Sequence, residues 1–255
     1  MQNLLAQVPF LIIGHRGAAG LAPENTLPSF ARAKALGCPM VELDVYRLPD
    51  RKAHPAGPDV LAVIHDRTLD RTTNRRGPVA DLRAEDLQRT DAGEGASIPT
   101  LDEVIKLLQA PSPDDLPHAT ALNIELKGPG TAAPVAQRLE RLEDMVVLVS
   151  SFNHDELAQF RALDSTTPVA PLFDRWQDNW IETATALNAS AVNLSVRAAT
   201  QAHVAEIRAA GYACFVYTVN RPEKARRLWQ SGVNGVFSDR PDLLLPLLPA
   251  LETRG

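Results

Sequence analysis

The strongest constraint on the fold is the regular alternation of short apolar runs with helix-forming segments. The strand-like runs cover residues 10–13, 39–45, 60–64, 121–126, 146–150, 168–173, 191–194, 213–219 and 233–238. The expected helices cover residues 26–36, 101–109, 131–143, 154–163, 176–187, 199–210, 222–231 and 241–252. Strands that alternate with helices predict a parallel sheet with helices packed outside it.

The number of strands distinguishes a closed barrel from an open sheet. No helical segment separates 39–45 from 60–64, and a loop rich in Pro and Gly at 47–59 joins them, so we expect an antiparallel hairpin there. Eight parallel strands remain, which predicts an α/β fold of the (β/α)8 TIM-barrel class. A doubly wound open sheet is the alternative, but the chain has no G-x-G-x-x-G turn. We expect one domain over 1–255, with the polar segment 67–99 as a small insertion after the hairpin.

Composition excludes several classes of partner. The net charge of −5 argues against nucleic acid or an anionic membrane as a binding partner. Cys38 and Cys214 lie far apart in apolar runs, so we expect free, buried thiols and a reducing compartment. The start of the chain has no basic segment of the kind that precedes a secretory signal. We therefore predict a cytoplasmic protein without stable membrane association, whose oligomeric state the sequence leaves unknown.

Charged residues occur at period two in two otherwise apolar strands. Glu42 and Asp44 leave the same face of one strand, and Glu125 and Lys127 do so on the next parallel strand. Either pair alone is as consistent with a solvated face or a simple ion pair as with a functional site. In a barrel, however, all four would point inward near the C-terminal ends of the strands, where active sites lie. Three carboxylates without sulfur favour one hard divalent cation, Mg²⁺ or Ca²⁺, with Mn²⁺ also possible.

Two histidines and an arginine complete the expected cluster. His15 and Arg16 follow the first strand, and His65 follows the returning arm of the hairpin. Arg16 and Lys127 beside a cation suit a phosphate group, and two histidines can act as general acid and base near neutral pH. This set predicts cleavage of a phosphodiester. Three further acids are interpreted as turn, cap or first-turn residues: Glu24, Asp66 and Asp239.

Motifs along nearly the whole chain resemble those of the glycerophosphodiester phosphodiesterases of the soluble bacterial type. In order, they are His15-Arg16-Gly17, Pro23-Glu24-Asn25-Thr26, Glu42-Leu43-Asp44-Val45, His65-Asp66 with Arg71-Thr72-Thr73, Ile98-Pro99-Thr100-Leu101, Asn123-Ile124-Glu125-Leu126-Lys127, Ser151-Phe152, Thr218-Val219-Asn220 and Ser238-Asp239-Arg240-Pro241. The resemblance implies a (β/α)8 fold, metal ligation by Glu42, Asp44 and Glu125, and acid–base catalysis by His15 and His65. It further implies that the phosphate and substrate are bound by Arg16, Lys127, Phe152 and Tyr217.

The implied reaction is the metal-dependent hydrolysis of glycerophosphodiesters, such as glycerophosphocholine or glycerophosphoethanolamine, to glycerol 3-phosphate and an alcohol. We expect His15 to be the acid and His65 the base. Two departures concern substrate preference: Tyr217 stands where the family commonly has tryptophan, and the loop 47–59 is unusually long. A phospholipase D-like lyase that forms a cyclic phosphate and a non-catalytic phosphate-binding barrel remain as alternatives.

Overall fold

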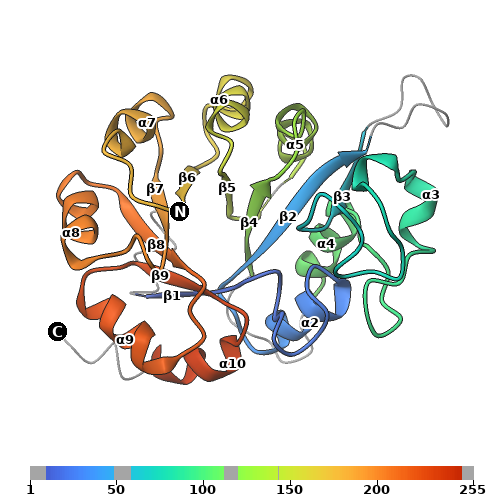
Figure 1. The fold of residues 1–255 in the computed structure, drawn as a ribbon, viewed down its shortest axis with the longest axis horizontal. Coiled ribbons are helices and arrows are strands. Elements are labelled where there is room, and N and C mark those ends of the chain that lie inside the picture. The colour runs from blue at the N-terminus through green and yellow to red at the C-terminus, as the bar shows by residue number, and fades with distance from the viewer. Residues whose placement is uncertain (1–9, 49–58, 112–119, 143, 249–255) are drawn as a thin grey trace.

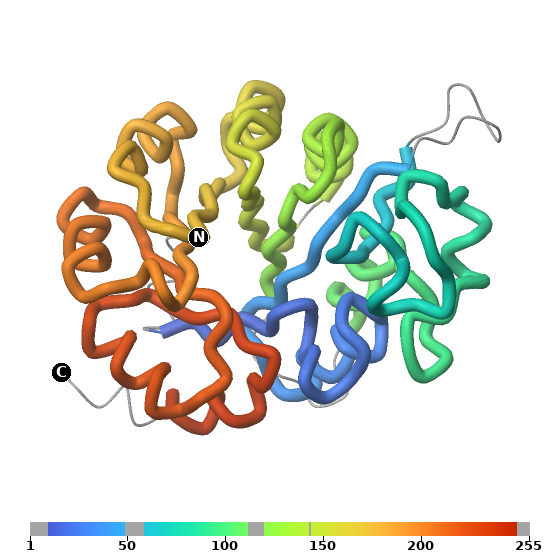
Figure 2. The backbone as a smooth tube through the Cα atoms, viewed as in Figure 1, coloured from blue at the N-terminus to red at the C-terminus, as the bar shows by residue number. Residues whose placement is uncertain are grey.

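A computed structural model describes residues 10–48, 59–111, 120–142 and 144–248 of the chain. The strands found in these residues are β1 (Leu11–Gly14), β2 (Met40–Leu48), β3 (Val60–Val63), β4 (Ala121–Leu126), β5 (Val147–Ser151), β6 (Val169–Phe173), β7 (Ala191–Ser195), β8 (Ala213–Tyr217) and β9 (Gly235–Ser238). All except β3 are parallel to their neighbours, and β1 pairs with both β2 and β9. The sheet is therefore a closed barrel, and the predicted TIM-barrel class is confirmed; Figure 2 shows the first strand beside the last ones.

Helices surround the barrel on its outer side (Figure 1). They are α2 (Leu27–Ala35), α4 (Leu101–Gln109), α5 (Ala132–Leu139), α6 (His154–Leu163), α7 (Trp180–Ala186), α8 (Gln201–Ala209), α9 (Pro222–Gln230) and α10 (Pro241–Leu244). The helices predicted at 101–109 and 154–163 have the observed bounds. Thr100 caps the first of these with the expected capping box, because its hydroxyl accepts from the Glu103 backbone N–H and the Glu103 carboxylate accepts from the Thr100 backbone N–H.

Three helices are shorter than predicted by five residues or more. Helix α5 ends at Leu139, before Asp144 takes a left-handed φ of 60°. Helix α7 starts at Trp180, because Trp176 lies in the preceding loop and stacks on His203 with ring centroids 3.8 Å apart. Helix α10 gives way to a 3₁₀ turn, η2 (Leu245–Leu247), which contains Pro246, and residues 249–252 lie outside the described part.

The hairpin forms as predicted. Strand β3 runs antiparallel to β2, with Val45 opposite Val63 and Leu48 opposite Val60. Strand β2 continues to Leu48, so the expected start of the loop at residue 47 is wrong; residues 49–58 lie outside the described part. The hairpin thus projects beyond the barrel and brings His65 back toward Asp44, since Ile64 donates its N–H to the Asp44 carbonyl at 3.0 Å.

Residues 67–99 pack against the outer part of this hairpin. They contain a 3₁₀ turn, η1 (Val79–Asp81), and a short helix, α3 (Ala84–Leu87). A separate apolar cluster joins them to the hairpin and contains Leu48, Ala62, Ile64, Leu69, Val79, Leu82, Leu87, Ala92 and Ile98. This segment therefore lies at the C-terminal end of β2, beside the expected site (Figure 1).

The interior of the barrel is filled by side chains up to the level of the site. The residues of this interior cluster are Leu11, Ile13, Met40, Ala121, Leu148, Ala170, Ala191, Ala213, Phe215 and Phe237. Both cysteines are free and buried, as expected. Among the described helices, none is long and apolar enough to cross a membrane.

Candidate active site

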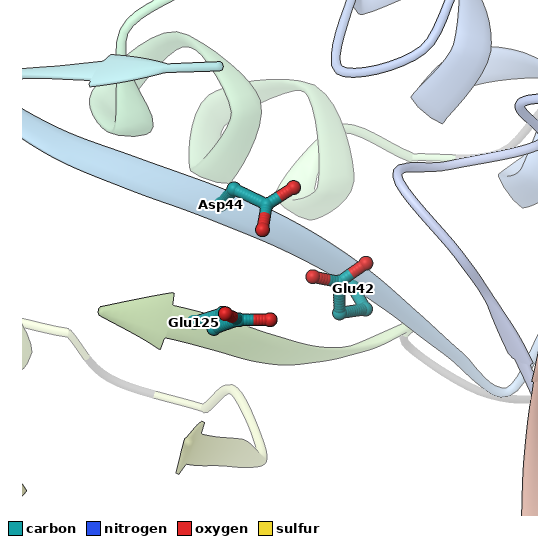
Figure 3. Close-up of side chains that lie close together, drawn as sticks. All are labelled: Glu42, Asp44 and Glu125. Carbon is teal, nitrogen blue, oxygen red and sulfur yellow. The ribbon is translucent and has the colours of Figure 1, made fainter. Parts of the chain in front are cut away.

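Three carboxylates form the centre of the candidate site. The parallel register sets Glu42 beside Asn123 and Asp44 beside Glu125, so the two strands present their acids to one space. One oxygen from each acid lies within 4.8 Å of the others. Figure 3 shows the three carboxylate groups gathered between β2 and β4. All three residues are at least 93% buried, with exposures of 3%, 1% and 7% for Glu42, Asp44 and Glu125.

Burial and mutual repulsion make this cluster unfavourable when it is fully ionised. Burial, together with the charges of Asp44 and Glu125, raises the pKa of Glu42 well above its ordinary value. Burial and the charge of Asp44 raise the pKa of Glu125 to about 7. The Asp44 Oδ1 atom is buried without a hydrogen-bond partner among the described residues. An all-oxygen set with an unsatisfied acceptor fits a hard divalent cation.

Arg16 and Lys127 lie on either side of the carboxylates. The Lys127 ammonium donates to Glu125 Oε1 at 2.8 Å and lies 3.7 Å from Asp44 Oδ1. The Arg16 backbone N–H donates to Glu42 Oε2 at 2.9 Å, and its Nε lies 3.5 Å from Asp44 Oδ2. Although burial lowers the pKa of Lys127, the charges of Glu125 and Asp44 raise it overall, so the ammonium keeps its proton. Both cations therefore contact the cluster directly.

His15 is held by a residue that the sequence reasoning interpreted as a cap. Its Nδ1 lies 2.6 Å from Asp239 Oδ1, and the other oxygen of Asp239 accepts from the Asn220 amide at 2.8 Å. Burial alone would raise the pKa of Asp239, but the hydrogen bond and charge of His15 outweigh burial, so the pKa lies below its ordinary value. Because an ionised carboxylate only accepts, Nδ1 carries the proton and Nε2 is left for chemistry. Asp239 lies in a bend directly after β9, in line with its interpretation as a turn residue, but that interpretation missed its contact with His15.

His65 has an equivalent partner next to it in the chain. Its Nδ1 lies 2.6 Å from Asp66 Oδ1, and Asp66 also accepts two hydrogen bonds from Arg71, at 2.6 and 3.0 Å. The Arg71 hydrogen bonds lower the pKa of Asp66, so the carboxylate is ionised and orients the imidazole. Burial lowers the pKa of His65 itself. Asp66 also lies in a bend, as its interpretation as a turn residue predicts, but that interpretation missed its contact with His65.

The motif Pro23–Thr26 supplies two more residues to the site. Glu24 lies in the loop before α2, as predicted, but it also accepts from Arg16 Nη1 at 2.7 Å, a contact that the loop interpretation missed. Asn25 donates its amide to Asp44 Oδ2 at 2.8 Å instead of capping helix α2. The available signal was a pair of polar residues in the loop between the His15-Arg16 pair and α2, but polar residues at that place equally suit a helix start.

A cavity joins these groups. About 130 Å³ in volume, it is lined by His15, Arg16, Glu42, His65, Asn123, Glu125, Ser150, Phe152, Leu172, Tyr217, Thr218 and Phe237. A more open cavity of about 630 Å³ adjoins it at His65, Glu125 and Phe152, and Lys127 lines that part. The Phe152 ring is 44% exposed, meets the Tyr217 ring edge to face at 5.8 Å, and lies 5.6 Å from the Lys127 ammonium. With Asp44 beneath, the predicted site residues are all brought together.

The chain is similar to known proteins along most of its length. The Glycerophosphoryl diester phosphodiesterase family matches residues 15–243 of the chain. A glycerophosphodiester phosphodiesterase of Bacillus altitudinis is 34% identical over 248 residues, which cover 91% of this chain and 95% of the relative. One from Caldanaerobacter subterraneus is 32% identical over 256 residues, covering 93% and 97% respectively.

Solved structures share the fold over the same length. An Oleispira antarctica phosphodiesterase in complex with the product sn-glycerol-3-phosphate has a TM-score of 0.85 and 28% identity, covering 96% of this chain and 99% of its own. A Thermotoga maritima glycerophosphodiester phosphodiesterase has a TM-score of 0.76 and 26% identity, covering 93% and 98%. The sequence match and the shared fold lead to one conclusion: this chain belongs to the glycerophosphoryl diester phosphodiesterase family.

Proposed function

We propose that the chain hydrolyses glycerophosphodiesters, such as glycerophosphocholine and glycerophosphoethanolamine, to glycerol 3-phosphate and an alcohol. The observation that carries the proposal is that two histidines, each paired with an aspartate, line the same cavity as Glu42 and Glu125. Its support from relatives is the membership of the family and the product, sn-glycerol-3-phosphate, in the complex of the Oleispira antarctica phosphodiesterase.

Glu42, Asp44 and Glu125 would hold one divalent cation, with Mg²⁺ or Ca²⁺ favoured by the oxygen donors and Mn²⁺ also suitable. When bound, the cation would neutralise the carboxylates and supply positive charge to a phosphoryl oxygen. Arg16 and Lys127 bind and orient the phosphate from two sides of the same cluster. Phe152 and Tyr217 form the aromatic wall against which the organic part of the substrate packs.

Each of the two histidines transfers a proton through its Nε2 atom. One removes a proton from the nucleophile, which is water or the neighbouring glycerol hydroxyl, and the other protonates the departing alcohol. We assign His65 as base and His15 as acid. Arg71 supplies a positive charge to the aspartate of His65, whereas the aspartate of His15 contacts the neutral Asn220 amide. A proton is therefore less stabilised on His65, whose pKa burial also lowers.

We place the chain in the cytoplasm as one domain over 1–255, with 67–99 as an insertion. Its free, buried cysteines and the single closed sheet support this placement. Its partner is a small glycerophosphodiester, and neither nucleic acid nor a membrane, because the catalytic groups lie inside a cavity and not on an exposed basic surface.

The direct test is hydrolysis of glycerophosphocholine, followed by ³¹P NMR. We expect activity in wild type with Mg²⁺, Ca²⁺ or Mn²⁺, and its loss with EDTA or in His15→Ala and His65→Ala. His203→Ala is the matched control, because His203 lies on α8 and stacks on Trp176 outside the cavity. Full activity with EDTA or in His15→Ala would contradict the proposal. A stable cyclic phosphate would indicate the lyase reaction, and an unchanged substrate with all three cations a non-catalytic barrel.

A further inference from the structure

Arg71 belongs to the segment 67–99 outside the barrel, yet its guanidinium lies between two carboxylates of the site. Its Nε and Nη2 donate to Asp66 at 2.6 and 3.0 Å. Its Nη1 and Nη2 donate to Glu24 at 2.8 and 2.7 Å. All three nitrogens are therefore used in bridging Asp66 to Glu24, which are 42 positions apart in the chain (66 minus 24).

Each bridged carboxylate passes the contact on to a group in the cavity. Asp66 Oδ1 lies 2.6 Å from His65 Nδ1. Glu24 Oε1 accepts from Arg16 Nη1 at 2.7 Å. A chain of hydrogen bonds thus runs from His65 through Arg71 to Arg16. It connects the proposed base to the proposed phosphate-binding group, although these two side chains are not bonded to each other.

We propose that Arg71 is a positioning residue, which fixes the orientations of His65 and Arg16 together from outside the cavity. The inference rests on the proposed function for its catalytic consequence, but not for its geometry. A planar guanidinium can donate to two carboxylates in fixed directions, whereas a lysine ammonium in its place is a single point charge. The fork, and not the charge alone, is therefore what the bridge requires.

Exposure separates this role from a stabilising one. The Arg71 side chain is 49% exposed, while the side chains of Glu24 and Asp66 are 20% and 25% exposed. Ion pairs that solvent reaches contribute little to the free energy of unfolding. Removal of Arg71 should therefore disturb the geometry of the site while the rest of the fold keeps its stability.

The bridge also sets the charges around His65. The groups that act on its imidazole are the carboxylates of Asp44 and Asp66 and the cations of Arg16 and Lys127. Without Arg71, the Asp66 carboxylate faces the imidazole with no cation hydrogen-bonded to it. The proton on His65 would then be held more strongly, so its pKa would rise in such a variant.

The first test is a titration of the histidine ring signals by NMR, which needs no activity. Wild type, Arg71→Gln and Arg75→Gln are compared, with the His65 signal assigned from His65→Gln. Arg75 is the matched control, because it pairs with Asp86 at 3.0 Å inside the same segment and does not reach the barrel. We expect the pKa of His65 to rise by roughly half a unit or more in Arg71→Gln and to stay unchanged in Arg75→Gln. An equal pKa in all three proteins overturns the inference.

The second test is steady-state hydrolysis of glycerophosphocholine across pH. Arg71→Gln should lose about 10- to 100-fold in kcat/KM, as outer partners of site residues do, with its thermal midpoint close to that of Arg75→Gln. The limb of the pH profile that belongs to His65 should move upward while the other limb stays. Arg71→Lys should recover only part of the loss. If Arg71→Gln does not fold, Arg71→Lys decides, because wild-type turnover by it overturns the requirement for the fork. A wild type that cleaves nothing contradicts the proposed function alone, since the titration still tests Arg71.

Discussion

The cost of gathering Glu42, Asp44 and Glu125 predicts how the metal-free protein responds to pH. Burial and the charge of Asp44 raise the pKa of Glu125 from 4.5 to about 7. Below pH 4.5 the group is protonated in both folded and unfolded states and has no effect. Between these two values only the folded state holds the proton, so the free energy of unfolding falls as pH rises. Above the folded-state pKa the carboxylate is ionised in both states, and the loss of free energy of unfolding is complete.

The size of this loss of stability follows from the shift in the pKa of Glu125. One pKa unit corresponds to about 1.4 kcal/mol, so the fully ionised Glu125 costs the metal-free fold about 3 kcal/mol above pH 7. Glu125→Gln removes this charge but keeps an oxygen that can accept from Lys127, which donates to Glu125 Oε1 in wild type. At pH 8 in EDTA we expect the variant to be more stable than wild type by about 3 kcal/mol, which is roughly 6–12 °C in Tm for a chain of this size.

The assay is thermal unfolding of both proteins from pH 4.5 to pH 8.5, in EDTA and again with Mg²⁺ or Ca²⁺. Added cation should stabilise wild type, by about 2.7 kcal/mol at a concentration of 100 Kd, and should stabilise Glu125→Gln much less. In EDTA the pH slope should be weaker in the variant, though not absent, because the pKa of Glu42 is also raised. The reasoning would be refuted if the metal-free variant were less stable than wild type at pH 8, or if both proteins had the same slope.

Three further substitutions test individual contacts. Asp239→Asn should lower kcat about 10-fold or more with little change in Tm, because it withdraws the carboxylate that orients His15; kinetics beside unfolding curves would show this, and an unchanged kcat would contradict it. Thr100→Ala should lower the free energy of unfolding by about 1 kcal/mol, since the hydroxyl caps α4; urea titration measures the loss, and Thr166→Ala, in an exposed turn, is a control. Gly17→Ala should destabilise the protein more, because Gly17 has a φ of +85° and an added Cβ would lie 2.6 Å from Ser29; equal Tm values for variant and wild type would show that the turn after β1 can adjust.

The periodicity of the sequence determined the barrel and the three carboxylates, but not the groups that orient the histidines. Glu42, Asp44 and Glu125 could be predicted because strand period and parallel register are local and regular. Asp239 could not, since it meets His15 across 224 positions of sequence and the same residue suits a turn equally well. Glu24 and Arg71 were missed for a similar reason: both lie in loops, where the partner of a charged side chain depends on how separate segments pack. Helix ends were the least predictable elements, as in α7, where stacking of Trp176 on His203 takes four residues from the expected start.

Because the barrel closes between β1 and β9, the residues of the site come from both ends of the chain. The carboxylates, His65 and Arg71 all lie in the first 125 residues, whereas Asp239, which holds His15, and Asn220, which contacts Asp239, follow the last two strands. A nascent chain could therefore assemble the acidic cluster long before His15 meets its partner. Turnover would begin only when the final strand docks against the first, so catalytic activity would report the last step of folding, while cation binding would report an earlier one.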